Sequence, residues 1–184
     1  MHCTRKLTDA VTWVGGSDRR LVLFENLFPI PRGVSYNAYV ILDEKTALLD
    51  TADASVGAQF LENVAAALDG RKLDYLIVDH MEPDHAAMIE AVLVRWPDLR
   101  LVVNAKTLPM LKMYFPTDSA AIDDALVVKE GDTLDLGKHK LTFVMAPMVH
   151  WPEVMMTFDT TTGTLFSADA FGTFGALEGA LFAD

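Results

Sequence analysis

Short apolar runs separated by polar turns recur along the chain and predict a domain rich in β-strands. Most of the runs contain Val, Ile, Leu, Phe and Tyr, residues that favour strands. We predict strands at residues 10–14, 20–28, 36–42, 46–50, 74–79, 100–104, 125–129, 140–146, 153–159 and 164–168. Three segments, at 54–68, 85–96 and 106–114, carry helical patterns instead.

The helical pattern at 54–68 is amphipathic. Val56, Phe60, Val64 and Leu68 recur every four residues and Gly70 follows, which predicts a helix with a glycine C-cap lying on a sheet. The early strands form hairpins, whereas helices separate the later ones, so we expect an α/β fold with a mixed sheet. No repeat or Pro/Ser-rich linker divides the sequence, and we predict one domain over residues 1–184.

Composition and charge exclude several classes of function. The 184 residues are 51% hydrophobic and 22% charged, enough for one folded domain with a core. With 15 basic against 26 acidic residues, the chain lacks the clustered positive charge that nucleic-acid backbones require. No apolar stretch indicates a signal peptide or a membrane span, and a single Cys3 suits a reducing compartment. We therefore expect a cytoplasmic protein that binds neither nucleic acid nor a membrane.

The strand predicted at 74–79 leads directly into a run of potential metal ligands, HMEPDH at 80–85. If the run stays extended, His80, Glu82 and Asp84 project to one side. Pro83 keeps the residue before it out of a helical conformation and suits a first helical turn, where His85 follows. Neighbouring carboxylates repel one another unless cations hold them, so the run predicts a metal site. The alternative is a solvated helix N-terminus.

Two later residues strengthen the metal interpretation. His150 and Asp169 each follow an apolar strand-like run. Singly, His150 is equally a core or turn histidine, and Asp169 is equally a loop cap. Together with the run at 80–85, they make a shared site the better interpretation.

Three motifs carry a family resemblance: HxExDH at 80–85, HWP at 150–152 and SADAFG at 167–172. They resemble the metallo-β-lactamase-like domain of flavodiiron proteins, and the likeness also covers GVSYNAY at 33–39 and ALLDT at 47–51. The resemblance implies an αββα sandwich. Hydrolases of the wider superfamily usually read HxHxDH, so Glu82 is typical of the diiron branch. A ligand set rich in carboxylates also suits iron better than zinc.

The resemblance implies a specific ligand set for two irons. One iron takes His80, Glu82 and His150, the other takes Asp84 and His85, and Asp169 bridges both. Asp50 resembles the carboxylate that orients a ligand imidazole in this superfamily, and it is equally a turn residue. In the family, the iron pair reduces dioxygen to water or nitric oxide to nitrous oxide.

The chain departs from the family pattern after the SADAFG motif. Family members continue to a further histidine ligand and to a flavodoxin-like domain that holds FMN, and neither occurs in these 184 residues. We therefore expect a sandwich incomplete in its C-terminal half, a weaker second iron position and an exposed sheet edge that favours homo-oligomers. TTTGT at 160–164 resembles a phosphate loop but lies between two strand-like runs, which predicts a hairpin turn. FMN and electrons would then come from a separate flavoprotein or partner chain.

Three other functions remain open at this point. A diiron centre without its own donor could bind oxygen as a sensor module. The chain could also be a zinc hydrolase of the superfamily, which Glu82 disfavours, or a remnant without catalysis. The remaining histidines, His2 and His139, are expected to be solvated.

Overall fold

The computed structural model describes residues 2–116 and 119–178 of the predicted domain; residues 1, 117–118 and 179–184 lie outside that description. The strands are β1 Arg5–Lys6, β2 Val11–Trp13, β3 Gly16–Asp18, β4 Leu23–Phe24, β5 Phe28–Pro29, β6 Val34–Tyr36, β7 Tyr39–Leu42, β8 Thr46–Leu49, β9 Tyr75–Ile77, β10 Arg100–Asn104, β11 Leu126–Val128, β12 Thr133–Asp135, β13 Lys140–Met145, β14 Met155–Asp159 and β15 Thr164–Phe166. The helices are η1 Ala54–Val56, a 3₁₀ turn, followed by α1 Gly57–Leu68, α2 Pro83–Ala86, α3 Ile89–Arg95, α4 Thr107–Tyr114 and α5 Ser119–Asp123.

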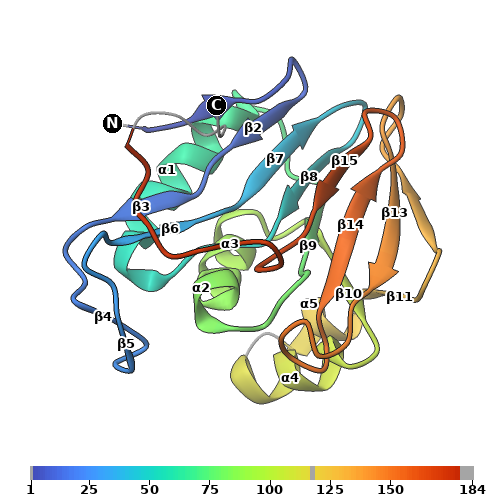
Figure 1. The fold of residues 1–184 in the computed structure, drawn as a ribbon. Coiled ribbons are helices and arrows are strands. Elements are labelled where there is room, and N and C mark those ends of the chain that lie inside the picture. The colour runs from blue at the N-terminus through green and yellow to red at the C-terminus, as the bar shows by residue number, and fades with distance from the viewer. Residues whose placement is uncertain (1, 117–118, 179–184) are drawn as a thin grey trace.

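The strands form two main sheets (Figure 1). The larger has seven strands in the order β1-β2-β7-β8-β9-β10-β11, and the smaller has four in the order β12-β13-β14-β15. Strands β1 to β8 pair antiparallel, whereas β8, β9, β10 and β11 pair parallel, with helices in the connections. The mixed sheet predicted from the sequence is confirmed.

Both faces of the larger sheet are buried, which explains its nearly continuous apolar strands. Leu48 faces the helices and packs in one core with Phe60 of α1 and Ile89 of α3. Its neighbour Leu49 points the other way and packs in a second core with Phe143 of the smaller sheet. The described residues thus form three layers, helices on one sheet and that sheet on another (Figure 1).

The segment 20–28, predicted as one strand, is instead a hairpin of β4 and β5. Glu25 and Asn26 have φ angles of 48° and 59°, in the left-handed region, and reverse the chain between the paired Phe24 and Phe28. Apolar residues on both sides of this turn resemble one continuous strand in the sequence, so the prediction of a single strand at 20–28 was wrong.

Two predicted helices also differ in detail. The helix expected at 85–96 is divided into α2 and α3, because the Met88 amide donates to Thr51 Oγ1 rather than continuing the helical ladder. Helix α1 ends on Asp69, whose φ of 48° supplies the left-handed C-cap expected of Gly70. Within the described residues, none of the helices has the length and apolar character to cross a membrane.

Candidate metal centre

The predicted ligands come from three distant parts of the chain and are brought together in the folded structure. The run 80–85 follows β9, His150 lies in the loop between β13 and β14, and Asp169 follows β15. The larger sheet therefore contributes four of the six predicted side chains, and the smaller sheet contributes His150 and Asp169.

The local conformation of the 80–85 run follows from Pro83. Glu82 has φ −61° and ψ 145°, an extended conformation, and Pro83 begins α2. Glu82 occupies the N-cap position but makes no side-chain cap hydrogen bond, so its carboxylate faces the site instead. Asp84 and His85 lie in α2, so the extended run stops at Glu82 and does not reach Asp84.

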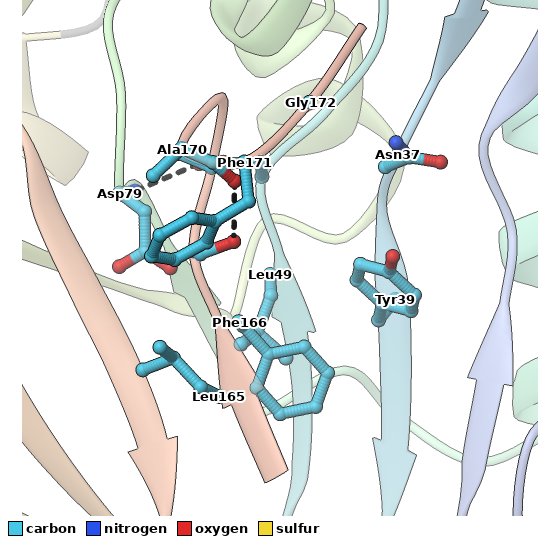
Figure 2. A pocket seen from close by; sticks show the side chains of 12 residues that line it. Asn37, Tyr39, Leu49, Asp79, Leu165, Phe166, Ala170, Phe171 and Gly172 are labelled. Carbon is cyan, nitrogen blue, oxygen red and sulfur yellow. Dashed lines mark hydrogen bonds between the residues drawn. The ribbon is translucent and has the colours of Figure 1, made fainter. Parts of the chain in front are cut away.

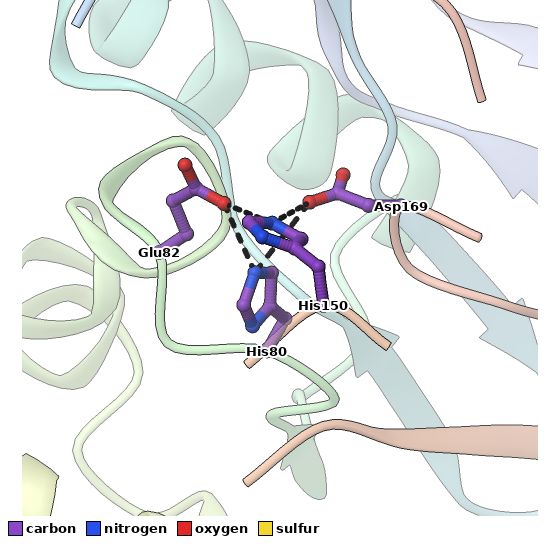
Figure 3. Close-up of side chains that lie close together, drawn as sticks. All are labelled: His80, Glu82, His150 and Asp169. Atoms are coloured by element: carbon purple, nitrogen blue, oxygen red, sulfur yellow. Dashed lines mark hydrogen bonds and ion pairs between the residues drawn. The ribbon is translucent and has the colours of Figure 1, made fainter. Parts of the chain in front are cut away.

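Four side chains converge in a first cluster (Figure 3). Glu82 Oε2 lies 3.1 Å from His80 Nε2 and 2.7 Å from His150 Nε2. Asp169 Oδ2 lies 3.3 Å from His150 Nε2 and 3.5 Å from His80 Nε2. One atom from each of the four residues lies within 4.8 Å of the others, the spacing of donors around a common metal ion.

A second cluster adjoins the first and contains Asp84, His85 and Asp169. His85 Nε2 lies 2.8 Å from Asp169 Oδ1 and 3.7 Å from Asp84 Oδ2. Asp169 belongs to both clusters and turns one carboxylate oxygen toward each. All six predicted residues are thus brought together in two adjoining groups.

Behind His85, Asp50 Oδ2 lies 2.9 Å from Nδ1 of the ring. Its other oxygen accepts the Asp79 amide at 2.7 Å. Asp50 also has a left-handed φ of 54° at the end of β8, so it is a turn residue and an imidazole partner at once. This is the geometry of a carboxylate that fixes the ring orientation of a ligand histidine.

Glu153 has the same relation to His80, and the sequence reasoning missed it. Its Oε1 lies 2.7 Å from His80 Nδ1, and the Glu153 side chain is fully buried. Residues 153–159 were assigned to a strand, which concealed the role. The available signal was an acidic residue, just after the HWP motif, leading into the apolar run at 154–156.

Burial and hydrogen bonding shift the pKa values of the clustered groups strongly. Burial lowers the pKa of His80, but the hydrogen bonds with Glu153 and Glu82 outweigh it and raise the pKa to about 9. Burial raises the pKa of Asp169, but the hydrogen bond from His85 prevails and lowers it to about 2. The carboxylates around His80 therefore stabilise positive charge on its ring, and they would also stabilise a bound cation.

Burial raises the pKa of Asp84 to about 7, and its Oδ1 is buried with no hydrogen-bond partner in the described part of the chain. The ion pairs described for Glu82, Asp84 and Asp169 are all with histidines, among the described residues. Carboxylates that pair with imidazoles, one of them with a buried oxygen that has no described partner, form the donor set expected around a metal cation. The residues present therefore fit a metal pair.

The clusters open onto a cavity of about 720 Å³. Its lining includes Glu82, Asp84, His150 and Asp169 of the clusters and an aromatic group formed by Phe24, Phe28 and Phe174. The rings of Phe24 and Phe174 lie 5.0 Å apart, between the β4–β5 hairpin and the segment after β15. A small molecule in this cavity would therefore lie beside both the metal-facing atoms and this aromatic group.

A smaller cavity of about 170 Å³ lies behind the site (Figure 2). Tyr39, Phe166 and Phe171 line it, and the buried Asp79 forms part of its wall. Ala168, next to Asp169, has a left-handed φ of 48°, a conformation that non-glycine residues adopt at a cost and that is common near functional sites.

His139 was expected to be solvated, and that expectation was wrong. Its side chain is buried, with Nδ1 2.7 Å from Asp159 Oδ2. The antiparallel pairing of β13 with β14 brings the two residues together, although 20 positions separate them.

The hairpin turn predicted at 160–164 is confirmed, with Gly163 at φ 72° between β14 and β15.

The comparisons with known proteins agree with this geometry. The chain is 38% identical over 168 residues to the nitric oxide reductase of Moorella thermoacetica, covering 90% of this chain and 41% of that protein. It is 37% identical to the anaerobic nitric oxide reductase flavorubredoxin of Citrobacter koseri, covering 88% of this chain and 33% of that protein. The chain therefore spans about two fifths of the length of the first relative and about a third of the second.

Two solved structures share the fold. The rubredoxin oxygen:oxidoreductase of Desulfovibrio gigas superposes with a TM-score of 0.89 at 32% identity, over 96% of this chain and 43% of that one. The flavodiiron protein of Giardia intestinalis superposes with a TM-score of 0.88 at 28% identity, over 96% of this chain and 42% of that one. These matches confirm the resemblance and the metallo-β-lactamase-like fold class. Residues 34–184 match the family described as ODP family beta lactamase, and the chain belongs to that family.

Proposed function

We propose that the chain is the diiron core of a flavodiiron-type oxidoreductase that reduces dioxygen, nitric oxide or both. In this proposal one iron is held by His80, Glu82 and His150, the other by Asp84 and His85, and Asp169 bridges the pair. The observation that carries it is the shared position of Asp169, with one oxygen facing each cluster. A carboxylate placed between two donor groups suits two adjacent cations.

The identity of the donors supports iron over zinc. Three carboxylates and three imidazoles make a harder donor set than the histidine-rich sites typical of zinc hydrolases. When bound, the iron pair supplies the redox equivalents for the reduction. The protein residues orient the imidazoles, and the aromatic side chains of Phe24, Phe28 and Phe174 line the cavity through which a substrate would reach them.

The proposal assigns FMN and the supply of electrons to a flavin-binding unit outside these 184 residues. The threonine-rich turn at 160–163 joins β14 to β15, so it offers no helix N-terminus for a flavin phosphate. The relatives include a putative diflavin flavoprotein of Thermosynechococcus vestitus, 41% identical over 152 residues, of which this chain covers 26%. We further propose that the chain forms homo-oligomers, since β15 is an outer strand of the described smaller sheet and Leu165 on it is 43% exposed. We also propose a cytoplasmic location, which suits the single Cys3.

The decisive experiment is metal analysis followed by turnover. Protein purified without oxygen and reconstituted with ferrous iron should hold two irons per chain. It should then consume nitric oxide or dioxygen when a chemically reduced flavoprotein is added. His85→Gln should lose one iron and the activity. His139→Gln is the control: it changes a buried histidine that also pairs with a carboxylate but lies outside the clusters, so this variant should retain both irons.

Three outcomes contradict the proposal. Preferential binding of zinc together with esterase activity would assign the chain to the hydrolases. One metal or none in the wild-type protein would exclude a dinuclear centre. Two irons with reversible oxygen binding and no turnover would indicate a sensor.

A further inference from the structure

Glu153 is a buried carboxylate that the proposed ligand set does not use. It is 1% exposed and lies just before β14, 73 positions from His80. Its Oε1 accepts the Met81 amide at 3.0 Å and lies 2.7 Å from His80 Nδ1. Its backbone carbonyl accepts Asn104 Nδ2 at 2.5 Å, which anchors the residue from the β10 side.

Such a carboxylate is costly to keep inside a protein. Removing an ionised carboxylate from water is strongly unfavourable unless hydrogen bonds and an opposite charge compensate. Glu153 Oε2 has no hydrogen-bond partner in the described part of the chain, so compensation is incomplete. The ionisable group described as its ion-pair partner is His80. An apolar side chain in its place would leave the Met81 amide and His80 Nδ1 without this acceptor, so the carboxylate has a specific role beside His80.

The geometry determines which nitrogen of His80 keeps its proton when a metal binds. A carboxylate only accepts hydrogen bonds, so Nδ1 must donate to Glu153. Nε2 faces the first cluster, where Glu82 Oε2 lies at 3.1 Å and Asp169 Oδ2 at 3.5 Å, so it is the nitrogen that gives up its proton when a metal binds there. The hydrogen bond also makes Nε2 a stronger donor toward a metal.

We propose that Glu153 is a positioning residue that holds His80 in the tautomer and orientation needed to bind metal through Nε2. The inference deepens the proposed function and rests on its first metal position. Glu153 acts on His80 as Asp50 acts on His85, at 2.7 and 2.9 Å respectively. Each metal position thus has its own carboxylate–imidazole pair.

The test uses cobalt(II), whose visible bands report each occupied position, in competition with a chelator. Glu153→Gln keeps the size of the side chain and removes its charge. It should weaken cobalt binding at the first position about 10- to 100-fold and leave the second position unchanged. Asp50→Asn should do the reverse. Asp159→Asn is the matched control, because it removes a buried carboxylate 2.7 Å from His139, outside the clusters, and should leave both affinities unchanged.

A second measurement does not depend on whether a variant folds. Nitrogen NMR of histidine-labelled wild-type protein loaded with zinc should show His80 protonated on Nδ1 and bound through Nε2. The opposite tautomer, or unchanged cobalt affinity in folded Glu153→Gln, overturns the role of Glu153. Absence of metal binding by the wild-type protein instead overturns the proposed metal centre, so the two failures are distinguishable.

Discussion

Asp169→Asn is the substitution that most directly tests the shared-ligand geometry. The change keeps the size of the side chain but replaces a carboxylate by a neutral amide, a much weaker ligand for a metal. Because Asp169 serves both clusters, the first position falls from four donor residues to three, and the second falls from three to two. Both metal positions should weaken together, although one residue has changed.

The expected magnitude follows from the number of donors left. Loss of residues that only support a ligand typically costs 10- to 100-fold in metal affinity, so loss of a direct ligand should cost at least about 100-fold. That factor corresponds to about 2.7 kcal/mol at the first position. At the second position two donors remain, Asp84 and His85, and binding there should be lost.

The assay is anaerobic loading with ferrous iron, removal of free metal and analysis of the iron bound per chain. The wild-type protein should hold two irons, and Asp169→Asn should hold one or fewer. Asp84→Asn is the comparison, because Asp84 belongs to the second cluster alone and should spare the first position. Two irons bound to Asp169→Asn at wild-type affinity would refute the bridging arrangement, as would equal losses at both positions in Asp84→Asn.

Three further predictions concern the fold that supports the site. The pKa of Asp18 is lowered from 3.8 to about 2, mainly by its hydrogen bond from Arg20, so its contribution to stability is present above about pH 4 and disappears as the pH falls toward 2. Urea unfolding between pH 2 and 7 should show a smaller stability change for Asp18→Asn than for wild type, and equal slopes would contradict the pairing. Gly15→Ala would place a Cβ 1.8 Å from the Tyr36 carbonyl oxygen, so it should destabilise the fold by at least about 3 kcal/mol, and a variant with wild-type melting temperature would contradict the packing. Phe143→Ala should lower the free energy of unfolding by about 3–5 kcal/mol, because Phe143 is fully buried between the sheets, and a loss below about 1 kcal/mol in urea titration would contradict that placement.

The sequence by itself determined the chemistry of the site and most of the strands. The run at 80–85 encodes four of the donors within six residues, and Pro83 sets the local conformation that turns Glu82 toward the site. Continuous apolar runs identified the central strands, because such a run is a local pattern that can be recognised from neighbouring residues alone. The hairpin at Glu25 and Asn26 was missed because a turn that uses left-handed residues other than glycine leaves little sequence signal.

Only the tertiary structure decided which donors share a metal position and what supports them. His80 meets Glu153 across 73 positions, and His85 meets Asp169 across 84. The burial of His139 against Asp159 likewise depends on the pairing of β13 with β14. These contacts arise where the two sheets pack and where strands find their register, and those are relations between segments distant in the chain. A residue's own neighbours in sequence specify its conformation, whereas its electrostatic partners are specified by the packing of the whole domain.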